Sequence, residues 1–391
     1  MNAKTMSLVL AAVASMSAGV AHAELPSFEA GGATFRIYGN IDEYLNFMRS
    51  SSGKSLNALQ DGGFLRTRLG VAGEKPVDDG IAIKFQLEQG LTSTSGEKAE
   101  GITSNRLFDR QAWAGIKTQY GEFRAGRQNS AVFYRGNYID FTARTMGSVV
   151  NAFGVPSRYD NDLAWISPRW SGVLLEAHYS FANTRENETT NQGVYQLAAD
   201  YENGPFRVGY AGLGGKAANG AKVDKTVFYN NLYANYNYGN GKIYATYVRS
   251  NNNGCATVKS DGTCDRSGLL NGTTPLGNIG GGTVGTVGTA NTYYNIYQLS
   301  ADYKLTQKLR VGALYGIIDA DGDKGASGWA VGAYYDIFKD TMVYALADVL
   351  ANETNAGFRP AGSAGLQKNF SASASNGESI RGIQLGFVYK F

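Results

Sequence analysis

The side chains of this sequence that could do chemistry are mainly arginines on the inward faces of the first predicted strands. The candidate pore-lining cations are Arg36, Arg66, Arg68, Lys84, Arg110, Arg124 and Arg158. Fixed guanidinium charges that face water in a narrow passage lower the energy barrier for anions. In a passage enclosed by these strands, such residues would select ions rather than perform turnover chemistry.

The elements that position these cations are strands with a period of two residues. At the C-terminus, Ile383, Leu385, Phe387, Tyr389 and Phe391 occupy alternate positions, so the segment has one apolar and one mostly polar face. Similar segments recur along the chain. We predict sixteen strands, at 35–47, 65–72, 81–89, 107–117, 121–128, 158–166, 173–181, 193–201, 206–213, 227–238, 242–249, 294–303, 308–317, 327–336, 341–349 and 381–391.

The connections between these strands alternate in length. Short turns lie at 74–80, 118–120, 167–172, 202–205, 239–241, 305–307 and 337–340. Long loops lie at 48–64, 91–106, 129–157, 182–192, 214–226, 250–293, 318–326 and 350–380. This alternation predicts an all-β fold, a 16-stranded antiparallel transmembrane β-barrel with short periplasmic turns and long outer loops. A barrel of that size encloses an aqueous channel.

The N-terminal segment predicts export. Residues 1–23 combine Lys4, an apolar run at 8–20 and Ala21-His22-Ala23, which is the pattern of a cleaved signal peptide. We therefore expect residues 24–391 to form a single barrel domain in the outer membrane. Losing Lys4 and no acid lowers the formal charge from +3 to +2, too little to indicate a nucleic-acid partner.

Strand parity places the arginines inside the barrel. An arginine facing lipid at the midplane would cost roughly 2–4 kcal/mol. Parity puts Arg66 and Arg68 inward, and it puts Arg110 on one face with Ala112 and Ala114. Arg127 has outward parity, which predicts a bulge or a strand end beside it.

Other chemistry has little support in the sequence. Cys255 and Cys264 lie in one polar loop of an exported chain, which predicts a disulfide. His178, on a strand face with Glu176 and Ser180, is the one histidine after residue 23. A hydrolase would need a nucleophile and base in a dry site, so we predict no catalytic residue, no metal site and no cofactor.

Several short motifs, in the order in which they occur along the chain, resemble those of the trimeric general diffusion porins of Gram-negative outer membranes. They are the segments 68–73, 109–117, 126–128 and 157–162, together with the terminal Phe391. The resemblance covers the chain after the signal peptide. It implies an inward-folded third loop at 129–157 that forms a constriction, faced by a ladder of Arg68, Arg110 and Arg158 with Arg66 and Arg36 nearby. It also implies a homotrimer in contact with outer-membrane lipid and lipopolysaccharide.

The third loop departs from the enteric pattern in its charge. Asp140 is the only carboxylate in 129–157, against Arg135 and Arg144. The leading hypothesis is passive diffusion of small hydrophilic solutes and ions with a mild anion preference, through a constriction that includes Asp140 and Arg144. The alternative is a substrate-selective porin for an organic anion or oligosaccharide, with Tyr38 and Tyr44 as further contacts. An adhesin role of the outer loops is a secondary hypothesis.

Glu43 is the exception on the lipid-facing side. Parity places it outward between Ile41 and Leu45, where a carboxylate is unfavourable. A bulge could turn it inward, a high position could bring it to the head groups, or a neighbouring subunit could bury it. The resemblance to trimeric porins favours the subunit contact.

Overall fold

The computed structural model describes residues 27–98, 107–181, 193–216, 226–251, 257–258, 264–265, 292–363, 365–366 and 375–391. The predicted signal peptide at 1–23 lies outside these residues. Cys255 also lies outside them, so its disulfide with Cys264 stays a prediction.

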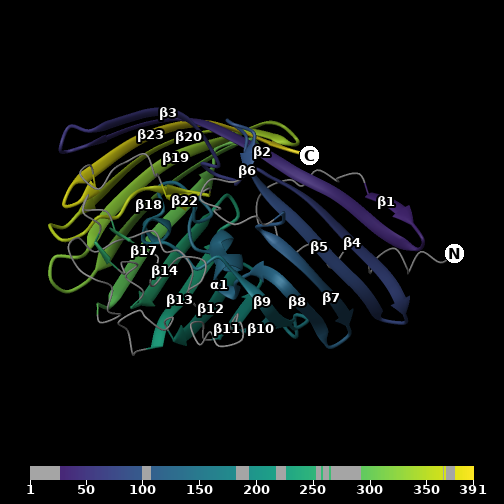
Figure 1. The fold of residues 1–391 in the computed structure, drawn as a ribbon. Coiled ribbons are helices and arrows are strands. Elements are labelled where there is room, and N and C mark those ends of the chain that lie inside the picture. The colour runs from purple at the N-terminus through teal and green to yellow at the C-terminus, as the bar shows by residue number, and fades with distance from the viewer. Residues whose placement is uncertain are drawn as a thin grey trace.

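Sixteen antiparallel strands form a closed barrel (Figure 1), as the sequence predicted. They are β2 (Ala33–Ser50), β4 (Arg68–Asp78), β5 (Ile81–Thr92), β7 (Gln111–Thr118), β8 (Gly121–Asn129), β9 (Arg158–Ile166), β10 (Val173–Ser180), β11 (Val194–Asn203), β12 (Phe206–Lys216), β13 (Thr226–Asn237), β14 (Lys242–Ser250), β17 (Tyr294–Lys304), β18 (Leu309–Asp319), β19 (Ala326–Phe338), β20 (Thr341–Asn352) and β23 (Ser379–Lys390). Each pairs with the next, and β23 pairs with β2 to close the ring. Closure leaves no strand edge with unsatisfied backbone groups in the membrane.

The last residue takes part in this closure. The Gly39 amide donates to the Phe391 carbonyl at 2.9 Å, and the Phe391 amide donates to the Gly39 carbonyl at 3.1 Å. A Cβ at position 39 would lie 2.5 Å from the Phe391 ring and 2.6 Å from the Arg68 carbonyl oxygen. Glycine is therefore needed where the first and last strands meet.

Side chains alternate as the period of two predicts. On β23, Ile383, Leu385 and Phe387 are exposed on the outer surface, whereas Gln384 and Val388 are fully buried on the inner one. The outer surface is thus apolar, and the inner surface carries the polar groups.

Some bounds of the predicted strands and loops were wrong. The stretch 48–64 is not one long loop, because β2 continues to Ser50 and β3 (Ser55–Asp61) folds back against it. The strand predicted at 65–72 is β4, which starts at Arg68, so Arg66 belongs to the connection before it.

The predicted strand at 107–117 begins later, at Gln111. Ala114 is exposed outside and Trp113 is buried inside. The strand face that the sequence analysis gave to Arg110, Ala112 and Ala114 is therefore the outer one. Arg110 precedes the strand and is buried nonetheless. The bulge expected near Arg127 is present as a register shift between Gly126 and Gln128.

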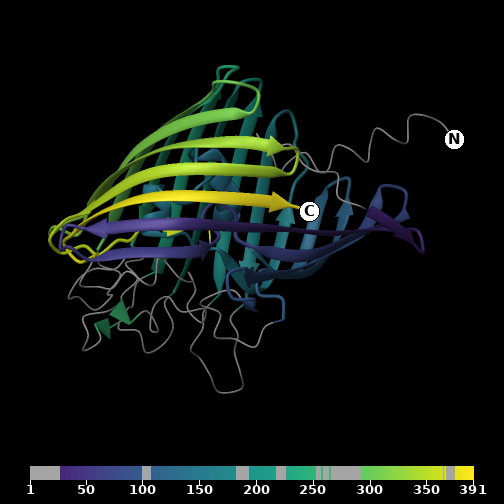
Figure 2. The ribbon, with the colours of Figure 1, turned by 90° about the horizontal axis from the view of Figure 1, so that it is seen from above.

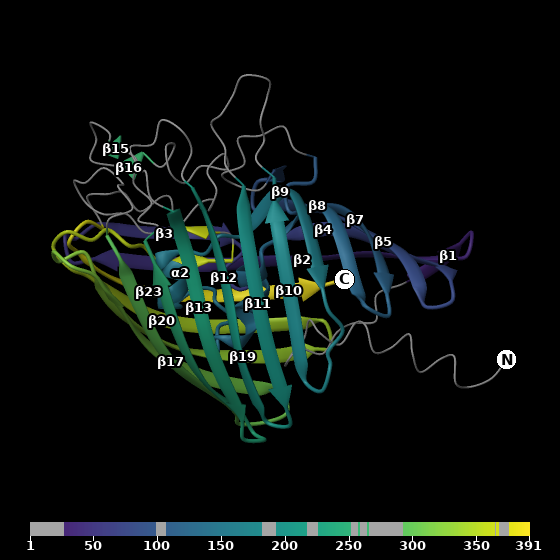
Figure 3. The same ribbon diagram turned by 90° about the horizontal axis from the view of Figure 1, so that it is seen from below.

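Short elements extend the barrel beyond its sixteen strands. β1 (Ser27–Ala30) pairs with β2, and β6 (Glu97–Lys98) pairs with β5. The two-residue strands β15 (Thr257–Val258) and β16 (Cys264–Asp265) pair beyond the strand ends (Figure 3). β21 (Ala361–Gly362) and β22 (Gly365–Leu366) form a further small pair.

The segment 129–157, called loop 3 below, lies inside the barrel (Figures 1 and 2). It forms α1 (Ala131–Tyr134), η3 (Arg135–Tyr138) and α2 (Val149–Phe153). Ser130 and Ser148 cap the two α-helices through their side chains. None of the helices in the described ranges is both long and apolar enough to cross a membrane.

Candidate pore constriction

Inward-facing side chains of successive strands hold the first half of loop 3 by its backbone. Gln196 of β11 accepts from the Ala131 amide at 3.0 Å. Asn235 of β13 donates to the Tyr138 carbonyl at 3.0 Å, and Thr246 of β14 donates to the Ile139 carbonyl at 2.9 Å. These bonds satisfy backbone groups that are buried away from water.

The second half continues along the same side of the barrel. The Phe141 amide donates to Ser300 Oγ of β17 at 3.0 Å, and Arg310 of β18 donates to the Phe141 carbonyl at 2.9 Å. The Val149 amide donates to Gln298 Oε1 of β17 at 2.8 Å. Loop 3 therefore follows the inner face of β10–β14, β17 and β18, called the anchor wall below.

Two glycines of β18 make room for this contact. A Cβ at Gly312 would lie 2.3 Å from Phe141 Cδ2, and a Cβ at Gly316 would lie 2.9 Å from Val149 Cβ. Phe153 packs further along, with its ring centroid 5.2 Å from that of Tyr294. Small residues on the wall and large residues on the loop thus fill the space on this side.

Asp140 organises loop 3 from within. Its Oδ1 accepts from the amide and hydroxyl of Thr142 at 2.9 and 2.8 Å and from the Arg144 amide at 2.9 Å. Its Oδ2 accepts from Ser148 Oγ at 2.7 Å and from Gln298 Nε2 at 2.8 Å. The side chain is 1% exposed, so the loop's one carboxylate is enclosed by donors.

Opposite the anchor wall, two predicted ladder arginines share one acid. Arg110 Nε lies 2.6 Å from Glu88 Oε1, and Arg68 Nε lies 3.9 Å from Glu88 Oε2. Arg68 also donates to Asn40 Oδ1 at 2.9 Å. One carboxylate therefore faces two guanidinium groups, which leaves a net positive charge.

Arg158 completes the predicted ladder without a carboxylate of its own. Its guanidinium carbon lies 4.7 Å from the ring centroid of Phe133 in loop 3, and it makes no ion pair among the described residues. Its Nε and Nη2 are buried without a hydrogen-bond partner in the same part of the chain. Two N–H donors of Arg158 therefore lack a hydrogen-bond acceptor in this part of the chain.

Arg144 contacts the same ring from loop 3. Its guanidinium carbon lies 4.4 Å from the Phe133 centroid. Burial lowers the pKa of Arg144 to about 10, and no carboxylate side chain forms an ion pair with it among the described residues. Phe133 therefore stacks with one cation from the wall and one from the loop.

The remaining predicted cations are paired or lie apart from the ladder. Lys84 Nζ lies 2.7 Å from Glu122 Oε2, and Arg124 Nε lies 2.6 Å from Glu122 Oε1. Arg66 Nε lies 3.8 Å from Asp61 Oδ2. The Arg36 guanidinium lies 5.4 Å from the Tyr38 ring centroid.

The sequence reading missed a second set of cations on the anchor wall. Arg207 of β12 stacks on Tyr138 at 3.9 Å, and Arg310 of β18 stacks on Tyr334 at 4.4 Å. Both have inward parity, because Phe206 and Val208 beside Arg207, and Tyr315 and Ile317 at the odd positions of β18, are exposed outside. The parity rule could have found them.

Comparison with known proteins identifies the family. A profile of the Gram-negative porin family matches residues 9–355. The chain belongs to this family. It is accordingly a pore-forming protein of the outer membrane.

Individual relatives are distant in sequence. An outer membrane porin protein of Bordetella pertussis is 27% identical over 321 residues, covering 76% of this chain and 79% of the relative. A major outer membrane protein P.IB of Neisseria gonorrhoeae is 25% identical over 200 residues, covering 50% of this chain and 52% of the relative.

Solved structures share the barrel. An anion-selective porin from Comamonas acidovorans matches with a TM-score of 0.67 and 19% identity, over 92% of this chain and all of that chain. Salmonella typhi OmpF in complex with daunomycin matches with a TM-score of 0.63 and 19% identity, over 94% of this chain and all of that chain. At these identities, the likeness concerns the fold.

Replacing Arg158 with Gln should reduce the ratio of anion to cation permeability of the porin. A charge about 5 Å from an ion in water changes its energy by about 0.8 kcal/mol, and salt screens part of this. We therefore expect a roughly twofold lower ratio, measured from the reversal potential across a planar bilayer in a salt gradient.

Arg127→Gln is the matched control, since Arg127 Nη1 lies 2.7 Å from Asp160 Oδ1 and its charge is largely compensated. It should change the ratio less than Arg158→Gln does. Equal effects of the two variants would show that the missing counter-ion at Arg158 has no influence on permeation.

Proposed function

We propose that this porin passes small hydrophilic solutes and ions by passive diffusion, with a mild preference for anions. The observation that supports it most is the charge balance around loop 3. Asp140 is enclosed by donors, whereas Arg158 forms no ion pair among the described residues and Arg68 and Arg110 share Glu88. The constriction therefore presents more cations than acids to the water.

The size of this anion preference depends on how strongly salt screens the charges that face water. Charges that face water are screened over about 8 Å at physiological ionic strength. Guanidinium groups on one wall thus bias ions close to them and leave larger neutral solutes to be limited by width. A mild preference that weakens as salt increases is the expected result.

A reversal potential recorded across a salt gradient tests the proposal directly. The purified porin in a planar bilayer should give the anion-selective sign at neutral pH, with a larger magnitude in dilute than in concentrated salt. A cation-selective sign would overturn the anion preference and leave the pore itself in place.

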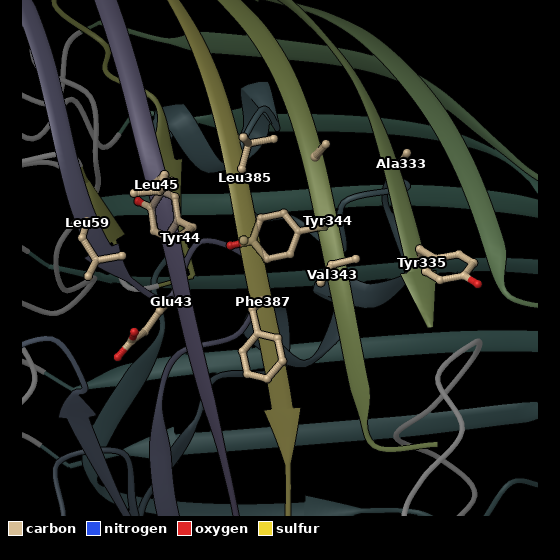
Figure 4. A pocket seen from close by; sticks show the side chains of 12 residues that line it. Glu43, Tyr44, Leu45, Leu59, Ala333, Tyr335, Val343, Tyr344, Leu385 and Phe387 are labelled. Atoms are coloured by element: carbon tan, nitrogen blue, oxygen red, sulfur yellow. The ribbon is translucent and has the colours of Figure 1, made fainter. Parts of the chain in front are cut away.

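We further propose that the mature protein is residues 24–391 and assembles as a homotrimer within outer-membrane lipid and lipopolysaccharide. Support for the trimer comes from the outer surface around Glu43. There a hollow of about 610 Å³ extends over β3, β2, β23, β20 and β19 (Figure 4), with a mainly apolar lining. Its exposed lining residues include Leu45, Leu59, Leu385 and Phe387.

Glu43 has no hydrogen-bond or ion-pair partner among the described residues, although it lies among these apolar side chains (Figure 4). A carboxylate there needs a donor from outside its own barrel. A second copy of the chain would both cover the apolar hollow and supply that donor. A solved Vibrio cholerae OmpT structure is described as a trimer form, and it shares this fold at 17% identity.

Glu43→Leu should therefore loosen the trimer, because it removes the group that a neighbouring subunit satisfies. We expect the oligomer band on a mildly denaturing gel to dissociate at a lower temperature than the wild type. Arg249→Leu, an outward charge on β14, is the control and should leave dissociation unchanged. Equal heat resistance of Glu43→Leu and the wild type would place Glu43 outside the contact.

A further inference from the structure

A buried chain of alternating charges links the barrel wall to loop 3. His178 of β10 lies with Nδ1 2.7 Å from Asp162 Oδ2 and Nε2 2.7 Å from Glu176 Oε1. The second oxygen of Glu176 accepts from Arg135 of loop 3. All four side chains are at most 5% exposed, and they are called the histidine clamp below.

The number of N–H donors on the imidazole decides how many carboxylates of the clamp it can satisfy. A neutral imidazole has one N–H, so it can donate to only one of two ionised carboxylates. An imidazolium has two N–H groups and satisfies both. The other oxygen of Asp162 accepts from Ser180 Oγ at 2.7 Å, which leaves the imidazole as the donor for Oδ2. With the imidazolium, two cations balance two anions.

The clamp ends at the first turn of loop 3. Arg135 also donates to the Ala131 carbonyl at 3.1 Å, and Ala131 is itself held by Gln196 of β11. Arg135 begins η3 directly after Phe133 and Tyr134, the part of the loop that faces Arg158 and Arg124. A shift of Arg135 would therefore move the ring that Arg158 and Arg144 contact.

We propose that His178 is a positioning residue of the constriction, and that its proton couples the placement of loop 3 to pH. The coupling runs from the imidazolium through Glu176 to Arg135. It concerns the placement of the loop and does not depend on the anion preference. His178 contacts no solute in this arrangement, because it is buried within the wall.

Other charged or titratable groups surround the clamp. Arg124 of β8, Tyr134 of loop 3 and Tyr233 of β13 interact electrostatically with Glu176 or Arg135. Tyr159 of β9 interacts with Asp162. Of the groups in and around the clamp, His178 is the one whose unperturbed titration lies nearest neutral pH.

The direction of the pH effect follows from the charge count. With His178 protonated, the clamp is neutral and every carboxylate oxygen that faces the ring has a donor. When the proton leaves as pH rises, one cation remains against two anions, and one carboxylate faces a nitrogen lone pair. Loop 3 is then held less firmly, so the open channel should become noisier toward alkaline pH.

Single-channel recordings between about pH 6 and about pH 10 test this, a range that covers imidazole titration and avoids most lysine titration. The wild type should show a reversible step in open-channel current noise as pH rises. His178→Gln should show high noise at every pH and no step. Breaking a buried pair raises the population of displaced states on the order of a hundredfold.

Two further variants keep the test informative if His178→Gln fails to fold. Arg135→Gln leaves the wall's imidazole and carboxylates in place and should also abolish the pH step. Thr246→Val removes another anchor of loop 3 without a titratable group, so it should raise the noise and retain the step. A pH step that survives in Arg135→Gln, or that disappears in Thr246→Val, would overturn the proposal.

A wild type without any pH step in this range would also overturn it. The sign of the reversal potential is a separate readout from these noise measurements. A cation-selective reversal potential would therefore overturn the anion preference and not the role of His178. Absence of the pH step in the noise would overturn the role of His178 and not the charge balance of the ladder.

Discussion

The asymmetry of this pore depends on the way loop 3 satisfies its buried polar groups. A segment inside a barrel must find partners for backbone groups that water does not reach. Here inward side chains of β11, β13, β14, β17 and β18 supply them, from Gln196 to Arg310. Loop 3 is thereby held to one wall, and the arginines of the facing strands remain beside the water.

The charges follow from this arrangement. Where loop 3 meets the anchor wall, cations are neutralised or stacked: Arg135 of the loop pairs with Glu176, and Arg310 of the wall lies 3.4 Å from Asp302 while it stacks on Tyr334. On the facing side, Glu88 pairs with two arginines, Arg68 and Arg110, and Arg158 forms no ion pair among the described residues. The carboxylate of Asp140 could have balanced these positive charges, but it accepts hydrogen bonds that hold the loop in shape. The net positive charge that we propose for the constriction is thus a consequence of how the loop is folded.

Most of the barrel could be predicted from the sequence because two rules act locally. Side chains alternate with a period of two, and a charge facing lipid is costly. The alternate residues from Ile383 to Phe391 were therefore assigned correctly to the outer face, and Glu43 was recognised as a charge on that face. Inward parity also placed His178 with Glu176 and Ser180.

The rest depended on contacts between distant segments. The strand face of Ala112 and Ala114 was misread as the inner one, because Arg110 was counted as part of a strand that begins one residue after it. β3 was read as loop because its pairing with β2 depends on a turn within 51–54. Asp140 was read as a lumen charge because its donors, Ser148 and Gln298, come from a helix cap and a strand far along the chain.

We expect anions, and not cations, to collect between loop 3 and the arginines that face it. Crystals of the porin soaked separately in bromide and rubidium salts would test this by anomalous diffraction. We expect bromide peaks beside Arg158 and the pair of Arg68 and Arg110, and no rubidium there. Rubidium at that position, with bromide absent, would contradict the account.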